Sequence, residues 1–181
     1  MTQGKRKRLD AVALWEYALR AVSGRAHSAG ELREKLRQRA ERAADVDAVV
    51  VRLKEHGYLD DRRFAETFAM ARRDNQGFGG VRVMRDLRAR RVAPKLAEQA
   101  VRQAYSDVDE TELIESYLAR KYRRVALAEF LYEPKNLAAA YRRLRLAGFT
   151  SGNVIRVLKR HASEAELLEE CEPPEEERGE P

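Results

Sequence analysis

Apolar side chains recur at helical spacing through most of this chain. Between residues 61 and 74, for example, Phe64, Phe68 and Ala71 fall at positions i, i+4 and i+7, which places them on one face of an α-helix. Similar stripes predict helices near 10–23, 28–40, 45–56, 61–74, 80–91, 94–105, 110–129, 134–147 and 151–161. No alternating β-branched run of useful length occurs. The chain is therefore predicted to be all-α.

Turn and capping residues mark the ends of these helices. Gly57 follows an apolar stripe and can close a helix in the left-handed conformation without a Cβ clash. Ser28 and Glu31 have the spacing of a capping box. The other predicted boundaries are closed by Gly24 and Gly148, opened by Pro94 and Pro134, and capped by Asp60 or Asp61 and by Ser151 or Asn153.

Three of the predicted helices resemble one another. The segments E-L-R-E-K-L-R-Q-R, R-V-M-R-D-L-R-A-R and A-A-Y-R-R-L-R-L-A align by Leu36, Leu87 and Leu144, which are 51 and 57 residues apart. This pattern predicts three tandem three-helix repeats that pack into an elongated, curved helical array. The expected organisation is a basic, disordered N-terminus (1–9), repeats at 10–60, 61–106 and 107–161, and an acidic, largely disordered tail (162–181).

Charge is distributed unevenly along the chain. The 181 residues contain 36 Lys and Arg and 30 Asp and Glu, a net charge of +6, but residues 162–181 hold nine Glu and one Arg. The tail therefore carries −8 and residues 1–161 carry +14, which favours polyanions or acidic proteins as partners. As a hypothesis, the tail competes for the basic surface in cis; a plain solubilising role is the alternative.

The cysteine content and the lengths of the apolar stretches indicate where in the cell the protein is located. Cys171 is the one cysteine, so no internal disulfide can form, which suits a reducing cytoplasm. The basic N-terminus is not followed by an apolar run, and no apolar stretch approaches eighteen residues. We expect a cytoplasmic monomer without membrane contact.

The residues that could support catalysis are sparse. His27, His56 and His161 lie near helix boundaries, with no cysteine or carboxylate at ligand spacing. The glycines of residues 77–80 have neither the preceding strand nor the following Gly-Lys-Ser/Thr of a phosphate loop. We therefore expect no enzyme activity, metal site or cofactor.

Arginine supplies the candidate site instead. Arg82, Arg85 and Arg88 lie opposite the apolar side of the 80–91 helix, and Arg72 and Arg73 precede it. A solvated surface would explain any single arginine, but like charges on one helix face destabilise it, so we interpret the set as a surface that binds a partner or DNA. For the third repeat both interpretations stay open. Its two clusters are Arg120, Lys121, Arg123 and Arg124, then Arg142, Arg143 and Arg145.

The aromatic residues fit the interior better than base stacking. Tyr58, Phe64 and Phe68 have helical spacing or lie beside a helix stop, so we predict that they are core residues. Phe78, within the glycine segment, is predicted to plug that loop.

Three segments resemble the RecX family, the bacterial regulators of the recombinase RecA. They are H-S-A-G-E-L-R-E-K-L (27–36), G-Y-L-D-D-R-R-F-A (57–65) and G-F-G-G-V-R-V-M-R-D-L (77–87), and the resemblance covers about residues 10–161. The family often has Pro where Gly80 stands, and Gly where Arg91 precedes Val92. The second departure leaves the shape of that turn open. Arg82 falls on a basic position of the family's middle motif.

The resemblance implies a non-enzymatic protein that binds RecA and its filament on single-stranded DNA. Family members dock in the filament groove and limit its growth or promote disassembly, which reduces strand exchange, ATP hydrolysis and co-protease activity. Direct contact with single- or double-stranded DNA stays open, as does the alternative of a stand-alone helical DNA-binding regulator.

Overall fold

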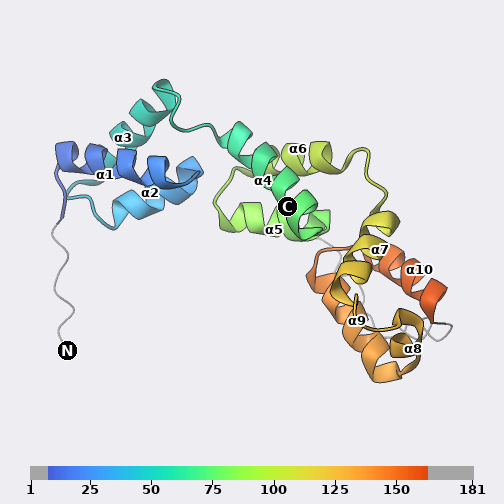
Figure 1. Ribbon diagram of the computed structural model, residues 1–181. Helices are drawn as coiled ribbons and strands as arrows, with labels where there is room; N and C mark the ends of the chain where they lie inside the picture. Colours follow the sequence, from blue (N-terminus) through green and yellow to red (C-terminus); the bar gives the residue numbers. More distant parts are fainter. Residues whose placement is uncertain (1–7, 163–181) are drawn as a thin grey trace, which may run out of the picture. The chain divides into compact units, whose positions relative to one another are not determined.

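The computed structural model describes residues 8–162, and every regular element in this range is an α-helix (Figure 1). The predicted all-α class is confirmed. The helices are α1 (Ala11–Gly24), α2 (Ala29–Arg37), α3 (Ala43–Glu55), α4 (Asp61–Gln76), α5 (Gly80–Ala89), α6 (Pro94–Tyr105), α7 (Glu110–Lys121), α8 (Leu127–Tyr132), α9 (Pro134–Leu146) and α10 (Ser151–His161). The predicted acidic tail lies outside the described residues, apart from Ala162.

The helices group into two compact units. Unit 1 combines the chain up to Ala71 with Met84–Ala104, and unit 2 combines Arg72–Val83 with the chain from Tyr105 onward. Helices α4 and α5 each contribute to both units. The three repeat boundaries given above remain a prediction.

The core of α1–α3 is aliphatic. Leu14, Leu32, Leu36, Val50 and Leu53 are fully buried there. The third repeat has a second core, to which α9 and α10 contribute Leu144 and Leu158 and which also contains the aromatic pair Tyr117 and Phe149. These stripes match the sequence pattern.

The middle repeat is built differently. The buried positions of α4 and α6 are all alanine, namely Ala65, Ala69, Ala97, Ala100 and Ala104. The predicted Phe64–Phe68–Ala71 stripe is therefore not the most buried face of α4, because the alanines occupy it.

The predicted helix over 110–129 is wrong. Helix α7 ends at Lys121, a turn follows, and α8 lies against α9 and α10. The turn allows Leu131 to be fully buried in the core, with Leu127 and Phe130 packed beside it. Leu87 and Leu144 are 57 residues apart, whereas Leu36 and Leu87 are 51 residues apart. Helix α8 has six residues, the same number as this difference.

The Ser28 half of the predicted capping box and the cap at Asp60 are confirmed, and the predicted cap of α10 is wrong. Ser28 Oγ accepts the Glu31 backbone N–H at 3.0 Å, and Asp60 accepts that of Arg63 at 3.0 Å. Helix α10 begins after Thr150, and neither Ser151 nor Asn153 caps it. Glu110 of α7 accepts the Thr150 N–H at 3.1 Å instead, a partner distant in sequence.

Three helices end in the same left-handed turn. Gly57 after α3 has φ +72°, Arg91 after α5 has φ +58°, and Gly148 after α9 has φ +92°. In each case the next residue donates its N–H to a carbonyl five residues back, as in a Schellman motif. Arg91 therefore makes the same turn as Gly57 and Gly148 although it carries a side chain.

Residues 28–31 of the first repeat pack against residues 90–91, a contact that we name joint 1 and that lies within unit 1. Ser28 Oγ donates to the Arg90 carbonyl, and the Arg90 guanidinium contacts Glu31 at 3.0 Å. A Cβ on Gly30 would collide with the carbonyl and Cβ of Arg91. The first and second repeats are thus joined by polar side chains around a glycine.

Residues 79–82 pack against 146–149 in the same way, within unit 2, and we name this contact joint 2. The N–H of Gly79 donates to the Ala147 carbonyl at 2.9 Å, and that of Val81 to the Gly148 carbonyl at 3.2 Å. A Cβ on Gly79 would collide with the backbone of Gly148. The glycine segment 77–80 therefore forms a backbone contact with the third repeat.

Candidate partner-binding surface

The five predicted arginines of the middle repeat do not form one uniform set. The Arg82 guanidinium lies 3.8 Å from the centre of the Phe78 ring and donates to the Leu146 carbonyl at 3.4 Å. Its Nε is buried. Arg82 is thus largely engaged in joint 2.

Arg72 and Arg73 also have local partners. Arg72 lies 5.9 Å from the Phe78 ring and contacts Gln76 at 3.4 Å. Arg73 pairs with Asp74 at 2.7 Å, and this hydrogen bond lowers the pKa of Asp74. Both arginines help to order the end of α4.

Arg85 and Arg88 differ from these three. Both are exposed on α5, three residues apart, and neither has a hydrogen-bond or ion-pair partner within residues 8–162. They are the members of the predicted set that are available to a partner.

The second predicted cluster also contains both an anchored arginine and exposed basic residues. Arg120 donates to the carbonyl of Gln76 and, at 3.5 Å, to that of Asn75, so it satisfies the C-terminal carbonyls of α4. Lys121, Arg123 and Arg124 are exposed at the end of α7 and in the turn after it, without a partner in the described range.

In the third cluster, Arg143 lies over the Tyr122 ring at 5.7 Å and Arg145 donates to the Phe149 carbonyl at 2.9 Å. Arg142 is exposed. Sequence periodicity could not separate anchored from available arginines, because their partners lie up to 64 residues away.

The prediction that Phe78 plugs its loop is confirmed. Phe78 packs against the core of the third repeat, and its carbonyl accepts the Tyr105 hydroxyl at 2.5 Å. Burial raises the pKa of Tyr105 well above its ordinary range, so this hydroxyl remains a donor.

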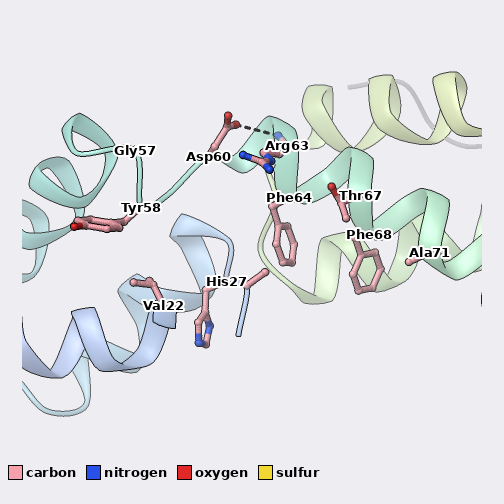
Figure 2. A pocket seen from close by; sticks show the side chains of 11 residues that line it. Val22, His27, Gly57, Tyr58, Asp60, Arg63, Phe64, Thr67, Phe68 and Ala71 are labelled. Atoms are coloured by element: carbon pink, nitrogen blue, oxygen red, sulfur yellow. Dashed lines mark hydrogen bonds between the residues drawn. The ribbon is translucent and has the colours of Figure 1, made fainter. Parts of the chain in front are cut away.

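A groove of about 450 Å³ opens beside α4 in unit 1 (Figure 2). Phe64 and Phe68 project from α4 into it, with ring centres 5.8 Å apart, and Tyr58 lies at its other end. All three were predicted to be core residues, but Phe64 and Phe68 are only partly buried and Tyr58 is exposed. The prediction is wrong because Ala65 and Ala69, and not the two phenylalanines, are the buried residues of α4. The groove is lined by Val22, Ala26, His27, Gly57, Tyr58, Asp60, Arg63, Phe64, Thr67, Phe68 and Ala71.

Glu31 organises the polar end of joint 1, which sequence reasoning missed beyond its capping role. Arg25 contacts its carboxylate at 2.6 Å, Arg90 at 3.0 Å and His27 at 3.4 Å. Burial raises the pKa of Glu31, but the bonds from Arg25 and the charge of Arg90 outweigh this, and the pKa is lowered overall. Burial and the charge of Arg25 lower the pKa of His27, which favours a neutral ring.

Within residues 8–162, no group of three or more His, Cys, Asp or Glu side chains is placed to hold a metal ion. None of the helices in that range is both long and apolar enough to cross a bilayer.

The helices and basic surface define a class of protein, a helical-repeat protein whose three-helix units carry exposed arginines. Family models identify the units more closely. Residues 15–53 match the first three-helix domain of RecX, and residues 60–101 match the second.

Relatives with assigned names agree with these matches. Regulatory protein RecX of Trichlorobacter lovleyi is 38% identical over 133 residues, which cover 73% of this chain and 80% of the relative. Regulatory protein RecX of Shigella sonnei is 32% identical over 132 residues, with 67% and 78% covered. The chain therefore belongs to the RecX family.

Solved structures support the fold. The crystal structure of RecX from Lactobacillus salivarius superposes with a TM-score of 0.65 at 16% identity, covering 83% of this chain and 95% of that one. A second crystal structure of a regulatory protein RecX gives 0.63 at 17% identity, covering 82% and 73%.

Proposed function

We propose that this protein binds RecA and the RecA filament on single-stranded DNA, and that it inhibits the recombinase, ATPase and co-protease activities of RecA. Membership of the RecX family is the observation that carries this proposal. The protein then acts in the cytoplasm, in DNA repair, recombination and the SOS response, as a monomer and without catalysis or a cofactor.

Charge supports the same proposal. Residues 1–161 carry +14, and a filament of protein and DNA offers both carboxylates and phosphates to such a surface. Arg85 and Arg88 are exposed and unpaired in the described part of the chain, so partner binding neutralises them without breaking an internal contact. Lys121, Arg123 and Arg124 form a secondary surface of the same kind.

The anchored arginines take a different role in this proposal. Arg82 holds Phe78 and Leu146 in joint 2, and Arg72, Arg73 and Arg120 order the end of α4. They position the binding surface, so their removal is expected to lower stability as well as affinity.

The test is the DNA-dependent ATPase of RecA, measured with increasing amounts of this protein. Replacing both Arg85 and Arg88 by Ala should raise the concentration needed for half inhibition about tenfold, with unchanged helicity and thermal stability. The matched control replaces Arg20 and Arg102, two exposed arginines elsewhere in unit 1, by Ala. Full inhibition by the Arg85–Arg88 variant would show that these two residues are not part of the binding site. No inhibition by the wild-type protein would refute the function itself.

A stand-alone DNA-binding regulator is the second candidate, favoured by the unpaired Lys121, Arg123 and Arg124. In that case the protein alone binds DNA at physiological salt, and its affinity falls steeply as salt rises. Tight binding to preformed filaments, with negligible binding to bare DNA under the same conditions, would exclude this candidate.

A further inference from the structure

Joint 2 contains two exposed aliphatic residues, one from each of its two segments. Val81 on α5 is 61% exposed and Leu146 on α9 is 64% exposed. Single exposed apolar residues are normal, but these two belong to segments that are far apart in sequence and that joint 2 brings into contact. The Val81 N–H bonds to the Gly148 carbonyl at 3.2 Å, and Arg82 bonds to the Leu146 carbonyl at 3.4 Å.

The edge of this apolar pair is positive. Arg142 lies one turn before Leu146 on the same face of α9, is exposed, and has no partner within residues 8–162. Helix α9, from Pro134 to Leu146, contains no acidic residue, and neither does the first turn of α5. The Arg82 guanidinium stacks on the Phe78 ring and donates to the Leu146 carbonyl, so it places a second positive charge beside the pair. The surface is thus apolar at its centre and cationic at its edge.

The geometry of this surface is fixed before any partner arrives. Gly148 holds a left-handed turn at φ +92°, and Gly79 approaches its carbonyl too closely to admit a Cβ. Two backbone hydrogen bonds, from Gly79 and Val81, close the contact. A preorganised surface loses little conformational entropy on binding, which favours its use in recognition.

We propose that Val81, Leu146 and Arg142 form a protein-docking surface, and that its partner presents an apolar side chain next to carboxylates. The inference rests on the proposed function, because RecA in its filament is then the protein that supplies this partner surface. In this complex Arg142 binds the partner's carboxylates by charge complementarity, and Val81 and Leu146 bury apolar area against the partner's apolar side chain. A sugar-phosphate backbone would satisfy the arginine but would gain nothing from the valine and leucine.

The test compares two double variants for binding to RecA filaments and to bare single-stranded DNA. Val81→Ser with Leu146→Ser removes the apolar pair, and exposure of both side chains protects the fold from the change. Val125→Ser with Tyr132→Ser is the matched control, since both are exposed apolar residues of unit 2 outside joint 2. The first variant should bind filaments about tenfold more weakly and bare DNA unchanged, while the control matches the wild type.

A third variant, Arg142→Glu, tests the edge of the surface and should weaken filament binding by a similar factor. Wild-type filament affinity in the Val81–Leu146 variant would overturn the docking surface and leave the proposed function in place. An equal loss of bare-DNA binding would reassign the surface to nucleic acid. Failure of the wild-type protein to bind filaments would overturn the proposed function, and the docking surface with it.

Discussion

The two joints place equivalent residues in contact through different chemistry. Residues 28–31 and 79–82 are separated by 51 positions, and their acceptors Arg90 and Ala147 by 57, the same spacings that relate the three aligned leucines. In joint 1 the Arg90 carbonyl accepts a serine hydroxyl, from Ser28. In joint 2 the Ala147 carbonyl accepts a backbone N–H, from Gly79.

The charged residue of each joint shows the sharper contrast. Glu31 in joint 1 and Arg82 in joint 2 occupy equivalent positions with opposite charge. Glu31 binds arginine side chains, whereas Arg82 binds a carbonyl and an aromatic ring. The repeat geometry therefore fixes which positions meet, and it leaves the chemistry of the contact free to diverge.

The first repeat also has a hydrogen-bond acceptor at the position equivalent to Arg90 and Ala147. Arg39 lies 51 residues before Arg90, and its carbonyl accepts the N–H of Leu9 at 2.7 Å. The Leu9 carbonyl in turn accepts the N–H of Glu41 at 2.9 Å. The segment before α1 therefore fills, in the first repeat, the position that Ser28 and Gly79 fill in joint 1 and joint 2.

The largest expected effect comes from replacing Gly148 with Ala. Its φ of +92° disfavours any side chain, and the added Cβ would collide with the backbone N and the Cβ of Arg82. We expect a loss of about 3–5 kcal/mol in the free energy of unfolding, from strain and overpacking together. Chemical denaturation would measure it.

The control for this variant is Gly57→Ala. Gly57 has a similar φ of +72°, but nothing lies within 4 Å of the added Cβ. It should lose about 1–2 kcal/mol, the cost of the left-handed conformation alone. Equal losses for the two variants would show that the close approach in joint 2 adds nothing to the destabilisation by Gly148→Ala.

Gly30→Ala tests crowding in joint 1 without a left-handed residue. The new methyl would meet the carbonyl and Cβ of Arg91, so we expect a loss of about 2–3 kcal/mol in thermal or denaturant unfolding. Gly152→Ala is the comparison, because no atom lies within 4 Å of its Cβ and it begins a helix. A harmless Gly30→Ala would mean that joint 1 adapts where joint 2 does not.

Glu31→Gln should cost about 1–2 kcal/mol at pH 7, because hydrogen bonds from Arg25 and Arg90 lose their charged acceptor. The pKa of Glu31 is lowered in the fold, so its stabilisation is complete above the ordinary glutamate pKa of about 4.3 and is lost progressively as pH falls from there through the lower pKa of the folded state. Denaturation of both proteins from pH 7 to pH 3 checks this. A gap between variant and wild type that does not narrow between pH 7 and pH 3 would contradict the assignment.

The smallest effect is expected from Arg91→Gly, which gives joint 1 the residue found at Gly148 in joint 2. Relief of the left-handed strain, about 1–2 kcal/mol, is largely offset by the greater freedom of glycine in the unfolded chain. The net gain should be about 0.5 kcal/mol in unfolding free energy. Arg88→Gly, at a right-handed helical position, should instead lose about 1 kcal/mol. Destabilisation by both changes would argue that the Arg91 side chain is needed in the joint.

Part of this architecture could be predicted from local patterns. The spacing of Leu32 and Leu36, or of Val46, Val50 and Leu53, specifies a buried face because the helical period is a property of the backbone. The turns at Gly57 and Gly148 follow from the freedom of glycine to adopt positive φ. These features depend on neighbours within one or two turns of helix.

Other predictions failed where distant residues decided the outcome. Phe64 and Phe68 have helical spacing, yet Ala65 and Ala69 are the buried residues of α4, and the phenylalanines line a groove instead. The break after Lys121 follows from the place that the third core offers to Leu131. Neither fact can be read from the period of the pattern.

The sequence alone determined the helical class, the repeat, the resemblance to RecX and the excess of positive charge. Only the tertiary structure decided which arginines are anchored and which are exposed, as the contrast between Arg82 and Arg85 shows. Periodicity reports which face of a helix a residue occupies. Whether a guanidinium on that face meets a carbonyl, a ring or water depends on segments that the chain brings together from more than sixty residues away.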